Sequence, residues 1–180
     1  GLSTFDEEIQ FNSSCRSTLA HQKIVFQELE KLLLSAPRTK KTSLAKTLHF
    51  LSDSLHQRSM VIIFSDLFES MHYQSDLLAA IRHLRFNKHE VIIFQVLDRE
   101  KELDFNFENR PWLFTDLETG TEYKINPNTV KAEYQLRMQA FKDELILKCG
   151  QNHCDFNSIN ISDGFYNVLN AFLLRRNKML

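Results

Sequence analysis

Apolar and polar residues alternate along the chain in two patterns, one typical of buried strands and one typical of amphipathic helices. Two runs, 60–64 and 91–97, are almost wholly apolar, and Asp66 and Asp98 stand at their ends. Continuous apolar runs of this length predict strands covered on both faces, as in a parallel sheet. Elsewhere apolar residues recur every three or four positions, which predicts helices.

The other elements follow from the same patterns and from turn residues. Helices are predicted over 18–34, 42–55, 75–86, 126–145 and 163–175, and a last strand over 156–161; Leu19, Phe26, Leu29 and Leu33 form the apolar stripe of the first helix. Residues 2–11 predict a hairpin, and residues 111–126 a second, inserted hairpin in which Gly120 supplies a positive φ angle. Strands alternating with helices predict a single α/β domain over 1–180, with a mostly parallel sheet and helices on both faces.

Composition limits the kinds of partner that this protein is expected to bind. The formal net charge of −1 over 180 residues gives no basic field for nucleic acid. No apolar run approaches the roughly 18 residues that a membrane span needs. The three cysteines, an odd number without framework spacing, favour free thiols and a cytoplasmic location.

Candidate chemistry gathers where the two apolar strands end. Ser65 and Asp66 follow the first strand, Asp98 follows the second, and Thr42 and Ser43 begin a helix that can approach the same rim. Ligands of open α/β sheets bind at the carboxyl ends of the strands, and these oxygen-bearing side chains suit Mg²⁺. The alternative is that both aspartates only cap the turns that follow them.

Other metal and catalytic patterns are missing from the sequence. The seven histidines form no His-x-x-x-His pair, and there is no Gly-x-Ser-x-Gly elbow. Cys149, His153 and Cys154 lack a complete zinc set, so partly buried free cysteines at a helix end and a strand start are expected. The aromatic residues Phe105, Phe107, Trp112 and Phe114 either pack beneath the inserted hairpin or form a contact patch on its surface.

Several motifs resemble a bacterial family called domain of unknown function 58. Residues 60–67 read Met-Val-Ile-Ile-Phe-Ser-Asp-Leu, residues 89–98 read His-Glu-Val-Ile-Ile-Phe-Gln-Val-Leu-Asp, and residues 114–120 read Phe-Thr-Asp-Leu-Glu-Thr-Gly. Asn126-Pro127 then leads into a helix that contains Tyr134, as in the family. The similarity covers nearly the whole chain.

The resemblance implies a von Willebrand factor A-like, Rossmann-like fold with a metal-ion-dependent adhesion site. Asp66 matches the last aspartate of that site and Thr42 is the best match for its threonine, but the Asp-x-Ser-x-Ser motif is absent. The family's first strand and helix would lie before Leu2. Mg²⁺ or another divalent cation would therefore be held weakly by this chain. Without the first strand, the sheet is expected either to close up or to pair with another copy as a strand-mediated homodimer.

The function implied by the resemblance is a non-catalytic protein-interaction module. Its partner would be a MoxR-type AAA+ ATPase, in the assembly or maturation of other complexes, and the contacting rim would be Ser43, Ser65 and Asp98. A Mg²⁺-dependent hydrolase that uses Asp66 and Asp98 is the alternative from a different class. A structural fragment whose surfaces serve only oligomerisation is the third reading.

Overall fold

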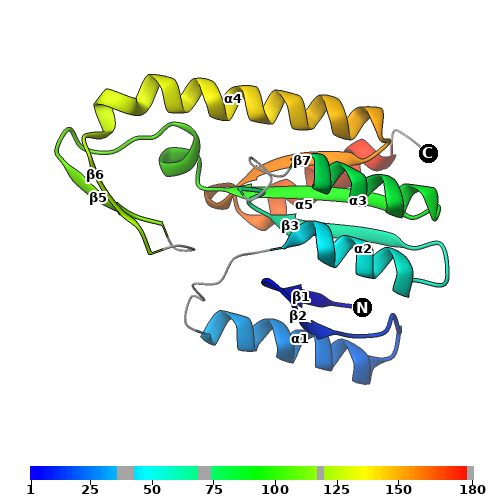
Figure 1. Ribbon diagram of the computed structural model, residues 1–180. Helices are drawn as coiled ribbons and strands as arrows, with labels where there is room; N and C mark the ends of the chain where they lie inside the picture. The colour runs from blue at the N-terminus through cyan, green and yellow to red at the C-terminus, as the bar shows by residue number, and fades with distance from the viewer. Residues whose placement is uncertain (36–42, 69–73, 117–119, 178–180) are drawn as a thin grey trace.

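The computed structural model describes residues 1–35, 43–68, 74–116 and 120–177. Its central sheet has three parallel strands in the order β3 (Met60–Ser65), β4 (Glu90–Leu97) and β7 (Asp155–Asn160), as Figure 1 shows. The predicted parallel sheet is thus confirmed. None of the described helices combines the length and the apolar character that crossing a membrane requires.

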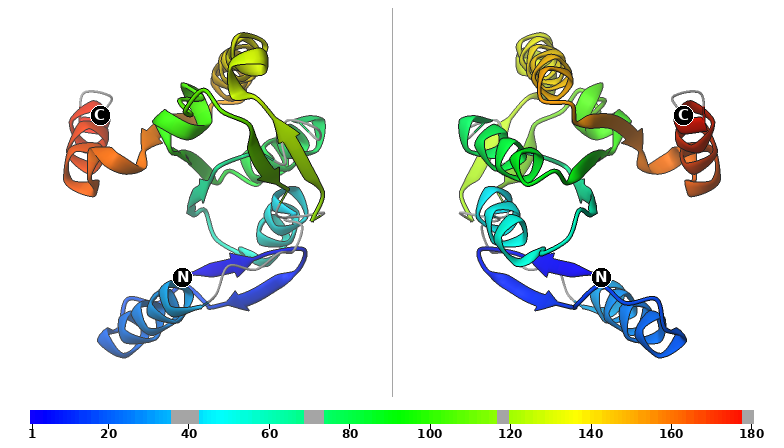
Figure 2. Two further views of the ribbon diagram at one scale, coloured as in Figure 1. Left: turned by 90° about the vertical axis from the view of Figure 1, so that its left-hand side faces the viewer. Right: turned by 90° about the vertical axis from the view of Figure 1, so that its right-hand side faces the viewer.

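Helices lie against both faces of this sheet, as predicted. The helices α2 (Leu44–Ser54), α3 (Gln74–Phe86) and α4 (Pro127–Gln151) share one apolar core with the odd-numbered residues of β3 and β4. The helix α5 (Phe165–Asn177) lies against the opposite face, where the ring of Phe172 contacts that of Phe94 edge-on. An ion pair of 2.7 Å between Arg176 and Glu90 also ties α5 to β4. Figure 2 shows the sheet between these two groups of helices.

The N-terminal residues form a hairpin and a helix beside α2. The strands β1 (Ser3–Phe5) and β2 (Ile9–Asn12) pair antiparallel, and α1 (Leu19–Leu34) begins after Thr18, whose hydroxyl accepts a hydrogen bond from a backbone N–H of the first turn. The predicted hairpin and helix are confirmed. Phe5 packs against the main core, and the N–H of Ser43 donates to the carbonyl of Asp6 at 2.9 Å.

Two expectations for this N-terminal part are not met in the described structure: the closed-up sheet, which was one of two alternatives, and the burial of the apolar stripe of α1. Because β1 and β2 form a sheet of their own, the central sheet has not closed up, and β3 is its edge strand. The apolar stripe of α1 is not buried either, since the side chains of Leu19, Phe26, Leu29 and Leu33 are all exposed. Figure 1 shows α1 beside the small hairpin of β1 and β2.

The inserted hairpin is supported by aromatic side chains. It consists of β5 (Trp112–Thr115) and β6 (Glu122–Ile125), and Gly120 has the predicted positive φ angle, 70°. Contacts between rings join Phe105, Phe107, Trp112, Phe114 and Tyr134 of α4. The aromatic residues singled out in the sequence therefore pack together beneath the hairpin. Two short helical turns complete the fold, η2 (Arg99–Leu103) after β4 and η3 (Ile161–Asp163) after β7.

The strand β3 is not covered on both faces, which corrects the expectation from its sequence. Val61 and Ile63 are buried in the main core. On the other face Met60, Ile62 and Phe64 are 47%, 46% and 64% exposed. The physical reason is that β3 stands at the edge of the sheet while α5 packs against β4, so apolar character alone does not secure burial.

Candidate functional site

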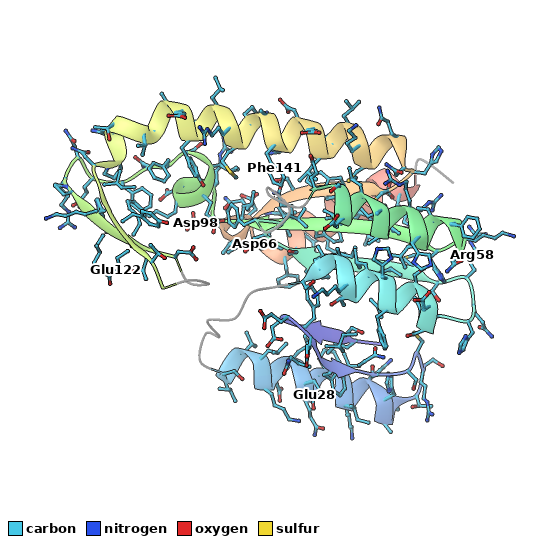
Figure 3. All side chains as sticks on the ribbon, in the orientation of Figure 1. Glu28, Arg58, Asp66, Asp98, Glu122 and Phe141 are labelled. Atoms are coloured by element: carbon cyan, nitrogen blue, oxygen red, sulfur yellow. The ribbon has the colours of Figure 1, made fainter. Side chains whose placement is uncertain are left out.

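The candidate site lies at the carboxyl ends of β3 and β4. Figure 3 shows Asp66 and Asp98 at this end of the sheet and Arg58 at the opposite end. Both aspartates cap the turns that follow: a carboxylate oxygen of Asp66 accepts from the N–H of Phe68 at 3.1 Å, and one of Asp98 accepts from the N–H of Lys101 at 3.2 Å. The local capping role considered from the sequence is therefore present at both positions.

The backbone after β3 is held in an unusual conformation. Leu67 has a φ angle of 64°, although its side chain is branched and fully buried. Ordinary residues rarely adopt positive φ angles, and such strain gathers at functional loops. The hydroxyl of Ser65 accepts from the N–H of Leu67 at 3.1 Å, which helps to hold this turn. The turn fixes the direction in which the exposed Asp66 leaves the sheet.

Gln95 supports the same turn from within the core. Its side-chain amide donates to the carbonyl of Asp66 at 3.3 Å. Gln95 is only 1% exposed, and its side-chain oxygen has no hydrogen-bond partner among the residues that the structure describes. A buried acceptor without a partner costs free energy, so the polar residue at this point of an otherwise apolar strand is a specific feature of the site.

Glu102 is a third acidic residue of this region, and it was not predicted from the sequence. Its carboxylate accepts from the N–H of Asp98 at 2.7 Å, which completes the turn η2. Burial raises the pKa of the Glu102 carboxyl against the lowering effect of that hydrogen bond, and the charges of Asp66 and Asp98 raise it further. The available signal was a glutamate four residues after Asp98, a spacing that lets a side chain reach back over one helical turn.

Ser43 and Thr42 are the other two residues predicted for this site. Ser43 precedes α2 and is half-buried, and its hydroxyl makes no capping hydrogen bond to that helix. Thr42 lies outside the described residues. The structure thus brings Asp66, Ser65 and Asp98 to one end of the sheet and adds Glu102 and Gln95 to them.

The acidic side chains do not form a complete cation site by themselves. Within the described part of the chain, no three histidine, cysteine, aspartate or glutamate side chains converge as ligands of one metal ion. Asp98 and Glu102 each use a carboxylate oxygen on a backbone N–H. A divalent cation beside the exposed Asp66 would therefore need further oxygen ligands from outside this set.

Comparison with known families gives one assignment. The family model described as "Protein of unknown function DUF58" matches residues 1–144. The match includes both hairpins, the strands β3 and β4 with their terminal aspartates, and most of α4. No curated protein and no solved structure matches the chain. Because the family model covers far more than half of its residues, this chain belongs to the DUF58 family.

Proposed function

We propose that this chain is a non-catalytic protein-interaction module with a von Willebrand factor A-like architecture. The observation that carries the proposal is the free edge and uncovered face of β3. The parallel sheet, the helices on both of its faces and the aspartates after β3 and β4 agree with the architecture. The partner suggested by the family resemblance is a MoxR-type AAA+ ATPase.

The surface offered by β3 has the properties of a strand acceptor. Its six residues contain no charge and no proline, and only β4 pairs with it in the described sheet. Natural proteins usually protect such an edge, because its free N–H and C=O groups pair readily with another extended segment. The exposed side chains of Met60, Ile62 and Phe64 add an apolar surface beside those groups. Together they favour an extended, alternately apolar segment of the partner.

The position of the N-terminal hairpin limits what can bind there. Figures 1 and 2 both show β1 and β2 on the side of β3 that faces away from β4. A partner would therefore contribute a single extended segment at this edge more easily than a whole sheet. The competing occupants are β3 of a second copy, in a strand-mediated homodimer, and the family's first strand, which the resemblance places before Leu2. Multi-angle light scattering over a hundredfold range of concentration detects the homodimer, because only the homodimer forms without a partner.

The docking experiment compares two isoleucines of nearly equal exposure. Ile62 on β3 is 46% exposed, and Ile146 on α4 is 47% exposed. We expect Ile62→Lys to weaken binding of a purified MoxR-type ATPase at least tenfold, because a charge on the docking face must be desolvated. Ile146→Lys should bind as the unaltered chain does. Circular dichroism checks that both variants fold, and equal binding by the two variants would place the contact elsewhere.

The acidic rim beside this edge would contribute a cation-dependent contact. Asp66 would be the acid on the metal side, Thr42 or Ser65 would supply a hydroxyl, and a carboxylate of the partner would complete the coordination of Mg²⁺ or another divalent cation. Ser43 and Asp98 would lie on the contacting rim. The strained turn at Leu67 and the buried Gln95 beneath it support a specialised role for this end of the sheet.

A thermal melt tests the cation directly. A ligand at about 100 times its dissociation constant adds roughly 2.7 kcal/mol, or about 5–10 °C in a domain of this size. We expect a shift of that order or smaller in Mg²⁺, Mn²⁺ or Ca²⁺ at millimolar concentration, lost in Asp66→Asn and kept in the control Asp143→Asn. A melt that no cation moves would mean that the isolated chain holds none, and the docking experiment would then be repeated without metal.

A Mg²⁺-dependent hydrolase is the second candidate, favoured by the electrostatic proximity of Asp66, Asp98 and Glu102. Its support is weaker, because Asp98 and Glu102 are already engaged with the backbone of η2. Turnover of phosphate esters in Mg²⁺, abolished by Asp66→Asn and by Asp98→Asn, would favour the hydrolase over the interaction module.

A further inference from the structure

Two buried cysteines meet where α4 ends and β7 begins. Cys149 is fully buried, Cys154 is 5% exposed, and both are free thiols. Cys149 is the third residue from the end of α4, and Cys154 directly precedes the first residue of β7. Neither residue belongs to the acidic rim or to the β3 surface.

The turn between them has the hydrogen bonds of a Schellman motif. The N–H of Cys154 donates to the carbonyl of Cys149 at 2.9 Å, and the N–H of His153 donates to the carbonyl of Gly150 at 3.1 Å. His153 has the positive φ angle, 51°, that this motif requires just after the helix cap. In such a motif the side chains at the positions of Cys149 and Cys154 normally touch, usually as an apolar pair. Here the backbone geometry brings two thiols together instead.

The thiols interact in the way that this geometry implies. A hydrogen bond from Cys154 lowers the pKa of the Cys149 thiol, although burial opposes the effect. The same hydrogen bond, together with burial, raises the pKa of Cys154. Cys149 is therefore the better nucleophile of the two, since the thiolate is the reactive form, and Cys154 stays protonated beside it.

We propose that Cys149 and Cys154 are a redox-active dithiol that a hydroperoxide converts into an internal disulfide. The sulfur of the Cys149 thiolate attacks one peroxide oxygen, the O–O bond breaks, and hydroxide leaves, which gives a sulfenic acid on Cys149. The sulfur of Cys154 then attacks that sulfenic sulfur, the Cys154 thiol proton passes to the departing hydroxyl group, and water leaves as the S–S bond forms. In total, two thiols and one hydrogen peroxide give one disulfide and two waters.

The disulfide would covalently join the last turn of α4 to the start of β7. Both cysteines belong to the core that α2, α3 and α4 share with the sheet. Because they are buried, the reaction depends on brief opening of the helix end, and it should be slower than oxidation of the exposed Cys15. Reduction by a dithiol reverses the modification.

The test uses the folded chain with Cys15→Ser, which removes the exposed thiol. After treatment with hydrogen peroxide and denaturation, Ellman's reagent should detect no thiols where untreated protein has two. The intact mass should fall by two hydrogen atoms, peptide mapping should link Cys149 to Cys154, and dithiothreitol should restore both thiols. A non-reducing gel should show a single chain.

The control adds Cys154→Ser, which leaves Cys149 without its partner. This variant should form a sulfenic acid that dimedone traps, with no loss of two hydrogens. The proposal is wrong if both thiols survive peroxide that fully oxidises Cys15 in the unaltered chain, or if each gains oxygen without a crosslink. Should the added substitution prevent folding, the peptide map of the Cys15→Ser protein decides alone.

Discussion

The strands β3 and β4 contain the same four residues and have very different surroundings. Val61-Ile62-Ile63-Phe64 lies beside Val91-Ile92-Ile93-Phe94 in register, residue for residue. Ile92 and Phe94 are 0% and 6% exposed, whereas their partners Ile62 and Phe64 are about half exposed or more. Identical sequence in identical register therefore leads to opposite burial on one face of the sheet.

Neighbouring elements explain the difference. β4 has a strand on each side, and α5 covers it through the contact between Phe172 and Phe94. β3 has one neighbouring strand, and its Phe64 only stacks on Phe94, with ring centroids 5.1 Å apart. The inner face is buried in both strands. An apolar strand residue thus contributes hydrophobic stability only where a second layer excludes water, and one face of β3 remains exposed.

The largest expected effect is a difference in stability between two alanine substitutions. Ile92→Ala should cost about 3 kcal/mol in the free energy of unfolding, because it opens a cavity in a fully packed layer. Ile62→Ala, one strand away in the same register, should cost about 1 kcal/mol or less. Urea unfolding measures both. Ile63→Ala and Ile93→Ala are the controls and should cost similar amounts, and equal losses for Ile62 and Ile92 would contradict the comparison.

Much of the fold could be predicted from the sequence because local signals and core packing agree. A helix was predicted over 75–86 from its apolar spacing, and in α3 the side chains with that spacing are all buried, namely those of Leu77, Leu78, Ile81 and Leu84. Asn126 and Pro127 start α4 as cap and first-turn residues. These positions are decided by periodicity and capping within one element, which a single sequence records.

The exposed face of β3 and the exposed stripe of α1 could not be predicted, since burial there depends on which other element packs alongside. Within the candidate site, Asp66 and Asp98 were found because they end apolar strands. Glu102 was missed because its role depends on the turn η2, which brings its side chain back to the N–H of Asp98. The four-residue spacing between Asp98 and Glu102 is a weak signal on its own, because it is useful only if a helical turn is already expected there.

A second, smaller effect concerns the starts of the two strands. The N–H of Ser59, just before β3, donates to Nδ1 of His89, just before β4, at 3.2 Å. Burial lowers the pKa of His89, so the neutral ring is the form that the fold favours. The stability that His89 contributes is present above its unfolded pKa of about 6.5, and it is lost as the pH falls from there through the lower pKa of the folded state. Protonation of Nδ1 also removes the hydrogen bond to Ser59, worth on the order of 1 kcal/mol.

The substitution His89→Asn should remove this pH dependence, because an amide oxygen can accept from Ser59 without titrating. Chemical unfolding at pH 7.5 and pH 5.5 compares the two proteins. The unaltered chain should lose more stability between these values than His89→Asn does. Equal losses of stability in the two proteins would show that another group controls the acid sensitivity. The hydrogen bond between Ser59 and His89 would then contribute little to stability.

The smallest expected effect on stability comes from Glu102, which lies at the carboxyl ends of the same strands. Burial is the main cause that raises the pKa of its carboxyl, and the charges of Asp66 and Asp98 raise it further. A carboxyl whose pKa is raised on folding destabilises the fold once it ionises, so the penalty grows as the pH rises above its unfolded value. Glu102→Gln keeps an oxygen for the N–H of Asp98 and removes the charge. It should raise the free energy of unfolding at pH 7 by a few tenths of a kcal/mol, since solvent screens this partly exposed group.

That gain should shrink as the pH falls below the unfolded pKa of about 4.3, because Glu102 then becomes protonated in both states. The exposed Glu100, in the same turn, provides the control, because Glu100→Gln removes an equal charge without a buried hydrogen bond. If both substitutions stabilise equally, general charge reduction explains the result. If only Glu102→Gln does, the ends of β3 and β4 are electrostatically coupled through Glu102, and the uncovered strand and the buried one share a single acidic rim.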